Sequence, residues 1–285
     1  NFKSKREKVK ILLVAEFFPK SKDCEIRGGA EGRTFFLAKY LVKAGHQVFV
    51  LASNEKGLPK EDEILGAKII RIGLAREYAQ AGEVLSRLSF VLQAEKAVDN
   101  LSFDLVDGQN FLGYLAAARI AKKKKIPSVA TYHDVWIGEW IKNVGLTSGI
   151  LGEVAERLAL RKSWALFIAI SQVVKKKLVK VGINSKKIVV IPVGIDWEEI
   201  QDIKVSKSSQ PEIICVSRLV EYKRVSDLIL ALKTVKSKIP QIKLKIIGTG
   251  PERKKLEDLA KNLGLQKSVE FLGFVEKHTD VLEKI

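Results

Sequence analysis

The sequence has few residues of the kinds that build metal centres or disulfide frameworks. Only two cysteines, Cys24 and Cys215, and three histidines occur among its 285 residues, and all five are widely separated. A zinc site needs several Cys or His ligands at short characteristic spacings, and a disulfide framework needs paired cysteines. The sequence therefore predicts neither a bound metal nor a disulfide scaffold.

Long apolar runs are missing as well. No stretch approaches the roughly 18 to 20 uncharged residues that a membrane-spanning helix requires, and no secretory signal precedes the first predicted strand. We therefore expect a cytoplasmic protein. Apolar residues make up 46% of the chain and charged residues 29%, which is typical of globular proteins, and the length suffices for two domains.

Acidic residues are outnumbered, with 33 Asp and Glu against 50 Lys and Arg, and the formal net charge is +17. The cations are spread through Lys-rich stretches such as 122–125 and 175–177, which favours solvated helix faces. Peripheral attraction to acidic lipids at the inner face of the membrane is the second interpretation. Aromatic residues make up only 7%, so we expect no nucleic-acid partner.

Short apolar segments alternate with amphipathic segments along the first two thirds of the chain. This alternation predicts a parallel sheet with helices on both faces, which is a doubly wound α/β domain. The predicted strands are 9–15, 47–52, 68–72, 104–107, 128–132, 165–170 and 187–191, and the predicted helices are 31–44, 82–98, 112–124, 151–162 and 172–180.

Proline and glycine interrupt this pattern in the segment IPVGID, and the chain stays polar up to Pro211. We predict a domain boundary here, with a first domain at 1–194 and a second at 195–285. Because only three strand and helix units follow, the last helix being unfinished, we expect the second domain to be incomplete and the natural protein to continue. The second set has strands at 212–216, 243–248 and 269–272 and helices at 225–238, 252–263 and from Thr279 onward.

Two cations follow the first strand of the second domain. Arg218 and Lys223 lie in the turn after 212–216. In an open α/β sheet, ligands bind beyond the carboxyl ends of the strands. Arg and Lys pair with phosphate oxygens there, the first as a planar fork and the second as a point charge. The turn is therefore a predicted diphosphate site.

Adjacent glycines precede the first predicted helix. Gly28 and Gly29, in RGGAEG, would let a ligand approach the backbone and leave free N–H groups for an anion. A nicotinamide-binding motif would instead place GxGxxG directly after the strand. A long loop intervenes here, and the glycines at 248 and 250 lack the third glycine, so the spacing argues against a dehydrogenase.

The segments GGAE, ATYHD, IPVGID, SRLVEYK, IIGTGPE and FLGFV follow one another in this order. Together they resemble the retaining nucleotide-sugar glycosyltransferases of family four, and the resemblance covers most of the chain. It implies the GT-B fold, with two Rossmann-like domains facing a cleft. It also implies transfer of a sugar from a UDP-, GDP- or ADP-sugar, a substrate and not a cofactor, to a saccharide or lipid-linked acceptor without a metal.

The resemblance assigns roles to individual residues. Arg218 and Lys223 match the pair that holds the donor diphosphate and stabilises its charge as it leaves, and His133 matches a histidine near the donor sugar. Matches to donor-binding segments are Gly28, Gly29, Gly250, Phe274 and Val275. Three further residues at the predicted strand ends of the first domain could line an acceptor site, although tryptophans often pack: Asn110, Trp136 and Trp140.

The chain departs from the family pattern at four places. The family commonly has Gly at 217, Asn at 193 and Gly at 224, where this chain has Ser217, Val193 and Arg224. The family's acidic ExxxxxxxE segment would lie beyond Ile285. Because that segment grips the donor's hydroxyls, we expect the printed chain to have little activity alone.

Two other interpretations stay open. Another GT-B enzyme, such as a sugar-nucleotide epimerase or a sugar phosphate synthase, would differ in whether product release requires an acceptor sugar. A non-catalytic basic module would bind lipid or nucleic acid through its +17 charge, with an affinity that falls linearly with salt on logarithmic scales.

Overall fold

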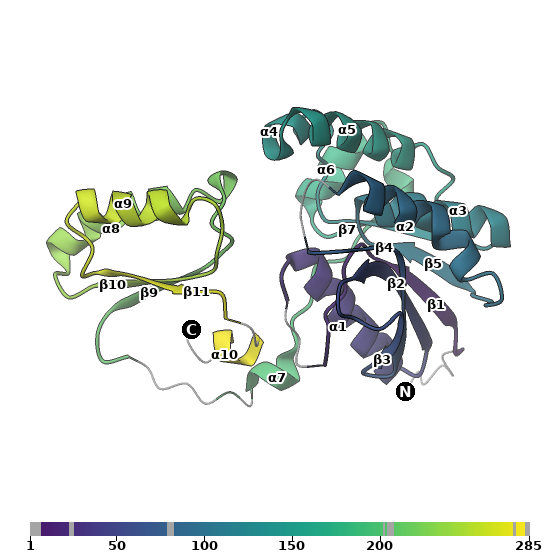
Figure 1. Ribbon diagram of the computed structural model, residues 1–285, viewed down its shortest axis with the longest axis horizontal. Helices are drawn as coiled ribbons and strands as arrows, with labels where there is room; N and C mark the ends of the chain where they lie inside the picture. Colours follow the sequence, from purple (N-terminus) through teal and green to yellow (C-terminus); the bar gives the residue numbers. More distant parts are fainter. Residues whose placement is uncertain are drawn as a thin grey trace. The chain divides into compact units, whose positions relative to one another are not determined.

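The computed structural model describes residues 7–22, 26–78, 83–201, 203, 208–275 and 278–282 (Figure 1). These residues form two compact units, which divide after Ile195. Cys24 and the predicted helix start at Gly82 lie outside the described residues.

Eight strands form the sheet of unit 1, in the order β3-β4-β2-β1-β5-β6-β7-β8. All neighbouring strands are parallel except β3 and β4. The predicted doubly wound α/β architecture is therefore confirmed, with one antiparallel pair added. The strands are β1 (Lys10–Val14), β2 (Gln47–Glu55), β3 (Glu61–Ile64), β4 (Ala67–Arg76), β5 (Leu105–Gly108), β6 (Ser128–Tyr132), β7 (Leu166–Ala169) and β8 (Ile188–Val190).

Strand β3 was not predicted, and β4 is twice as long as the predicted 68–72. The two strands form a hairpin through Leu65 and Gly66, both of which have positive φ, at 50° and 79°. Two-residue hairpin turns of this kind usually carry Asn or Asp before the glycine. Because a leucine stands there instead, these residues carry no clear turn signal.

The helices of unit 1 lie on both sides of this sheet. Helices α2 and α3 contact each other on one face, α5 contacts α3, and α1 lies on the other face (Figure 1). None of the helices in the described ranges is both long and apolar enough to cross a bilayer. The helices are α1 (Gly29–Lys43), α2 (Val84–Ala97), α3 (Phe111–Lys124), α4 (Trp140–Val144), α5 (Leu146–Leu160) and α6 (Gln172–Lys180).

The prediction was wrong about the segment before α5. The sequence pattern predicts no helix between 132 and 151, but the residues around Trp140 form helix α4, and α5 begins at 146, not at 151. A Cβ at Gly149 would meet the backbone of Ile141, and one at Gly152 would meet the Trp140 ring. Glycines are poor helix formers, yet these two let α4 pack closely on α5. Tertiary packing therefore overrides local propensity here.

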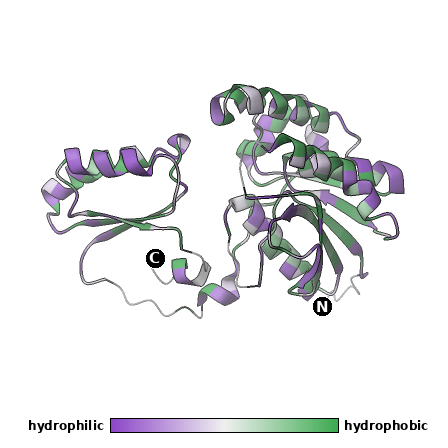
Figure 2. Cartoon of the chain, in the orientation of Figure 1, coloured by the Kyte–Doolittle hydropathy of each residue, from purple (hydrophilic) through white to green (hydrophobic). Residues whose placement is uncertain are grey.

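The core of unit 1 lies between the sheet and the helices. Leu12, Val14 and Phe90 are fully buried, and they belong to one cluster that extends from β1 through α2 and α3 to α6. The strands are coloured mostly hydrophobic in Figure 2. Burial of these apolar side chains is the main favourable contribution to folding. The packed core also holds the carboxyl ends of the strands in fixed positions.

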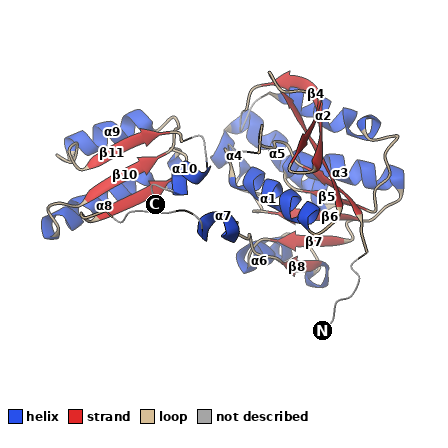
Figure 3. Ribbon diagram, turned by 90° about the horizontal axis from the view of Figure 1, so that it is seen from below, coloured by secondary structure: helices blue, strands red, loops and turns tan. Residues whose placement is uncertain are grey.

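Unit 2 contains a three-stranded parallel sheet in the order β11-β10-β9, a partial second Rossmann-like domain (Figure 3). Its strands and main helices lie close to the predicted ranges. Leu244 and Ile246 of β10 are fully buried against the helices. Helix α7 was not predicted, because the segment after IPVGID is polar. The elements are α7 (Trp197–Gln201), β9 (Glu212–Val216), α8 (Val225–Lys238), β10 (Lys243–Ile247), α9 (Arg253–Asn262), β11 (Val269–Gly273) and α10 (His278–Leu282).

Candidate functional site

The turn after β9 carries the two predicted diphosphate-binding cations. Arg218 donates a hydrogen bond from Nη2 to the Tyr222 hydroxyl at 2.6 Å. The Tyr222 ring centroid lies 5.9 Å from Arg218 Cζ and 5.8 Å from Lys223 Nζ. Neither cation forms an ion pair with a carboxylate in the part of the chain that the structure describes. One aromatic ring therefore holds two uncompensated cations beside each other.

The loop after β10 fixes the backbone of this turn. Gly248 and Gly250 have φ of 139° and 158°, and a Cβ at either would clash with the carbonyl oxygen of Ser217 or Leu219. The amides of Ser217 and Leu219 donate hydrogen bonds to the carbonyls of Ile247 and Thr249 at 3.0 and 2.9 Å. Gly250 is thus required by packing between the two loops, and its donor-binding role stays a prediction.

The loop after β11 reaches the same edge of the sheet. The Gly248 amide donates to the Gly273 carbonyl at 2.7 Å, and the predicted residues Phe274 and Val275 follow directly. Phe274 is 45% exposed. The carboxyl ends of β9, β10 and β11 therefore bring the predicted donor residues of unit 2 together. Sequence reasoning missed Tyr222, whose only signal was an aromatic ring four residues after Arg218.

In unit 1, the predicted glycines begin α1. Gly28 is the N-cap in an extended conformation, with φ of −161°. Gly29 is exposed, and a Cβ there would have no heavy atom within 4 Å. The protein's own packing does not require glycine at 29. The first amides of a helix lack intrahelical partners and point outward, which suits an anion.

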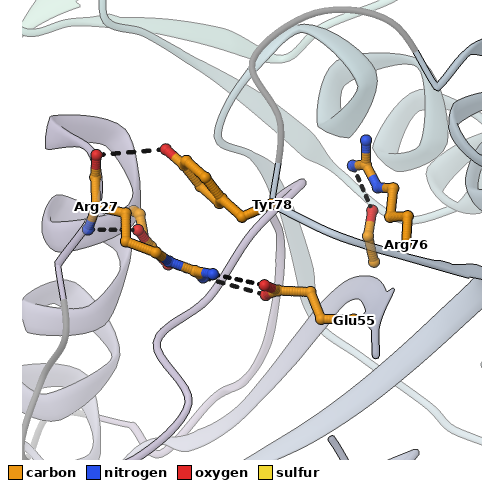
Figure 4. Close-up of polar contacts among 6 residues, drawn as sticks. Arg27, Glu55, Arg76 and Tyr78 are labelled. Carbon is orange, nitrogen blue, oxygen red and sulfur yellow. Dashed lines mark hydrogen bonds and ion pairs between the residues drawn. The ribbon is translucent and has the colours of Figure 1, made fainter. Parts of the chain in front are cut away.

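An ion-pair cluster holds the loop that leads to these glycines (Figure 4). Arg27 pairs with Glu31 and Glu55, each at 2.5 Å. The Tyr78 hydroxyl donates to the backbone carbonyl of Arg27 at 3.3 Å, so β2, α1 and the chain after β4 all contact this one residue. Sequence reasoning missed this cluster, because its members lie far apart in the chain.

A second buried pair lies nearby in unit 1. The Arg76 side chain, labelled in Figure 4, is fully buried. It donates from Nη2 to Glu16 Oε1 at 2.8 Å and to Ser53 Oγ at 3.0 Å. Arg87 also pairs with Glu16. These contacts tie the segment after β1 to the ends of β2 and β4.

His133 directly follows β6 and is largely buried. Its Nε2 atom has no hydrogen-bond partner in the described ranges. Burial, with a smaller effect of the Arg33 charge, lowers the pKa of His133 to about 4. The imidazole is therefore neutral at pH 7, with one ring nitrogen available to a ligand hydroxyl.

A polar network lies at the ends of β5 and β6. Arg33 donates from Nη1 to Gln109 Oε1 at 2.8 Å, and Gln109 donates from Nε2 to Asp107 Oδ2 at 2.5 Å. The Thr131 hydroxyl donates to Asp107 Oδ1 at 2.9 Å. Burial raises the pKa of Asp107 to about 7 and lowers the pKa of Arg33. Sequence reasoning did not identify any of these four residues.

The structure places the three predicted acceptor residues near the end of β6 and the start of α3. Asn110 is the N-cap of α3 and accepts a hydrogen bond from the Glu16 amide at 3.2 Å. The rings of Trp136 and Trp140 lie 5.4 and 4.4 Å from Phe111. Trp140 is only 8% exposed, so most of its ring is occupied by packing. The acceptor role of all three stays a prediction.

Glu156 anchors the two tryptophans from α5. It is fully buried and accepts hydrogen bonds from the Trp136 amide and from Trp140 Nε1, the latter at 2.6 Å. Burial raises the pKa of Glu156 to about 7. No group of three or more His, Cys, Asp or Glu side chains arranged to hold a metal ion occurs among the described residues.

Comparison with known proteins decides the family. The model of Glycosyltransferase Family 4 matches residues 27–199, which is more than half of the chain. The chain belongs to glycosyltransferase family 4. The model of Glycosyl transferases group 1 matches the following part of this family 4 chain, residues 196–284. Membership of glycosyltransferase family 4 is therefore confirmed, while the retaining mechanism stays a prediction.

Individual relatives of this family 4 chain are distant. An uncharacterized glycosyltransferase of Methanocaldococcus jannaschii is 26% identical over 295 residues, which cover 97% of this chain and 72% of the relative. The alpha-monoglucosyldiacylglycerol synthase of Streptococcus pneumoniae is 23% identical over 261 residues, 82% of this chain and 56% of that protein.

Solved structures show the same fold. Anabaena HepE in complex with UDP and glucose has a TM-score of 0.68 at 21% identity, covering 97% of this chain and 71% of HepE. The sucrose-phosphate synthase of Thermosynechococcus elongatus has a TM-score of 0.73 at 17% identity, covering 97% of this chain and 73% of the synthase. At these identities the likeness establishes the GT-B fold alone.

Proposed function

We propose that this protein is a retaining hexosyltransferase that takes its sugar from a UDP-, GDP- or ADP-sugar and needs no metal. The observation that carries the proposal is the pair Arg218 and Lys223 beside one tyrosine ring at the carboxyl end of β9. Cleavage of the sugar–phosphate bond develops negative charge on the departing diphosphate. Preorganised cations stabilise that charge more than they stabilise the bound substrate.

In the proposed reaction an oxygen of the acceptor bonds to the anomeric carbon while the bond from that carbon to phosphate breaks. The acceptor approaches the face of the sugar from which the phosphate departs, so the configuration is retained, and the departing phosphate accepts the acceptor's proton. His133 is neutral at pH 7 and would position the sugar through a hydrogen bond. NMR of the product would show the donor's anomeric configuration, and an inverted product would refute this step.

The donor is tested by binding. We expect one of UDP, GDP and ADP to bind the chain saturably and raise its Tm, because a ligand of the folded state stabilises it. Loss of one charge-assisted contact costs about 1.5–3 kcal/mol, so Arg218→Gln and Lys223→Gln should each weaken binding by roughly tenfold or more.

Lys233→Gln is the matched control for the donor experiment. Lys233 is exposed on α8 of the same unit, so this variant removes the same charge away from the turn and should bind as the wild type does. Equal affinity in all four proteins would refute the assignment of the two cations. Salt-dependent binding that ignores the nucleotide would favour the basic-module alternative.

We further propose a lipid-linked acceptor and peripheral contact with an acidic membrane surface. Helix α5 exposes Leu146, Ile150, Val154 and Leu158 at intervals of four residues, each between 46% and 64% exposed. Such spacing forms one apolar stripe. Exposed apolar stripes on a strongly basic protein suit binding to an anionic bilayer surface.

Sedimentation with vesicles tests this contact. We expect the chain to sediment with vesicles containing phosphatidylserine and much less with phosphatidylcholine alone. Replacing Ile150 and Val154 with serine should reduce sedimentation without lowering Tm, because both side chains already face solvent. Unchanged sedimentation of that double variant would refute the role of the stripe.

A further inference from the structure

We propose that Arg33 binds an oxyanion carried by a substrate, and that Gln109 and Asp107 form a relay that positions its guanidinium for this purpose. The inference rests on the proposed function in one respect, which is that the oxyanion is part of the sugar donor or of the acceptor. Nothing in the motif pattern pointed to Arg33, which lies one helical turn after Gly29 on α1.

The first argument is that Arg33 is held without a direct ion pair among the described residues, although the charge of Asp107 acts on it from beyond Gln109. In the described ranges, its one hydrogen-bond partner is the uncharged amide of Gln109. Yet Arg33 is mostly buried, and a mostly buried charge is normally paired. Most of its five N–H donors therefore remain available to a ligand.

The second argument is the direction of the relay. Arginine can only donate, so the Gln109 oxygen faces Arg33 and its NH₂ group faces Asp107. Gln109 is fully buried and Asp107 nearly so, and Thr131 satisfies the other side of the carboxyl group. The amide thus fixes the guanidinium and keeps it out of direct contact with the Asp107 carboxyl group, so that the N–H groups that face away from Gln109 can meet a ligand.

The third argument is the surroundings of Arg33. In an α-helix, residues at i and i+4 share a face and the later side chain leans toward the N-terminus. Arg33 therefore shares a helix face with Gly29, where the helix begins and no atom fills the space of a Cβ. The charge of Arg33 acts on His133, whose buried Nε2 atom has no hydrogen-bond partner among the described residues. A cation, a helix start and an open hydrogen-bonding atom together suit a phosphate or carboxylate.

Two sources can supply such an oxyanion, the donor diphosphate and an anionic group on the acceptor. Titration calorimetry of the whole chain with UDP, and with inorganic phosphate in the presence of saturating UDP, distinguishes them. Arg33→Gln should weaken UDP binding by about tenfold if the donor is the source. It should weaken phosphate binding by that factor, with UDP binding unchanged, if the acceptor is the source.

Controls separate positioning from charge. Arg161→Gln removes an equal charge from an exposed position at the end of α5 and should change neither affinity. Gln109→Leu should weaken the same ligand as Arg33→Gln but by a smaller factor, because the charge remains. If neither Arg33→Gln titration differs from wild type, the proposal is overturned.

A measurement on the wild type guards against misfolded variants. Phenylglyoxal modifies accessible arginines, and peptide mass spectrometry can follow Arg33 and Arg161 separately. We expect UDP or phosphate to slow modification of Arg33 by at least about fivefold and to leave Arg161 unchanged; equal rates with and without both ligands would overturn the proposal. If UDP does not bind at all, the proposed donor fails, while protection by phosphate alone still supports Arg33.

Discussion

Replacing Gly29 with alanine separates what a ligand requires from what the fold requires. Gly29 is the first residue of α1, and an added Cβ would have no protein atom within 4 Å. Alanine is a better helix former than glycine by about 0.5–1 kcal/mol. For a domain of about 150–250 residues, each kcal/mol shifts Tm by roughly 2–4 °C. We therefore expect the Tm of Gly29→Ala to be unchanged or a few degrees higher.

Donor binding should respond in the opposite direction. If a diphosphate approaches the backbone at Gly29, the methyl group occupies the contact surface. Inserting a methyl into a close-packed contact costs about 1–3 kcal/mol. This corresponds to a loss of roughly five- to 150-fold in affinity. The variant should thus be at least as stable as the wild type and bind the nucleotide clearly less well.

Differential scanning fluorimetry and titration calorimetry with UDP, GDP and ADP measure the two quantities. Gly194→Ala is the matched control, because a Cβ at Gly194 also meets nothing within 4 Å. It should change neither Tm nor affinity by more than a small amount. Equal affinity of Gly29→Ala and wild type would refute an approach of the ligand at Gly29, and a lower Tm would show that the fold itself needs this glycine.

Three further variants test the geometry described above. Gly250→Ala should lower Tm by several degrees and weaken nucleotide binding, because its Cβ would clash with the Leu219 carbonyl; an unchanged Tm would contradict this packing. The pKa of Glu156 is about 7 in the fold and about 4.3 when unfolded, so the folded state binds more protons and the free energy of unfolding should fall as pH rises between these values. Glu156→Gln can still accept a hydrogen bond from Trp140 but does not titrate. In urea titrations at pH 5 and 8, its free energy of unfolding should therefore decrease less than that of the wild type, and an equal decrease would refute the raised pKa of Glu156. Arg224 has a φ of 52°, in the left-handed region that strains a residue with a Cβ. Arg224→Gly should therefore raise the free energy of unfolding by up to about 1 kcal/mol. A marked decrease in this free energy, measured by urea titration, would contradict backbone strain at Arg224.

Much of the fold followed from local patterns. Strand β6 and helix α6 have the predicted bounds, because a buried apolar run and an amphipathic helix with Ser171 as its N-cap are local signals. Helix α4 and strand β3 were missed. Their stability depends on a close approach between Gly152 and Trp140 and on an unusual hairpin turn at Leu65, and neither depends on local propensity.

The candidate site divides in the same way. The family and the location of Arg218 and Lys223 follow from the sequence alone, since a strand end in a parallel sheet is where ligands bind. Tertiary structure alone decided that Gln109 orients Arg33 and separates it from Asp107. The reason is physical: periodicity reports which face of an element is buried, but the pairing of polar groups depends on which elements the fold brings together.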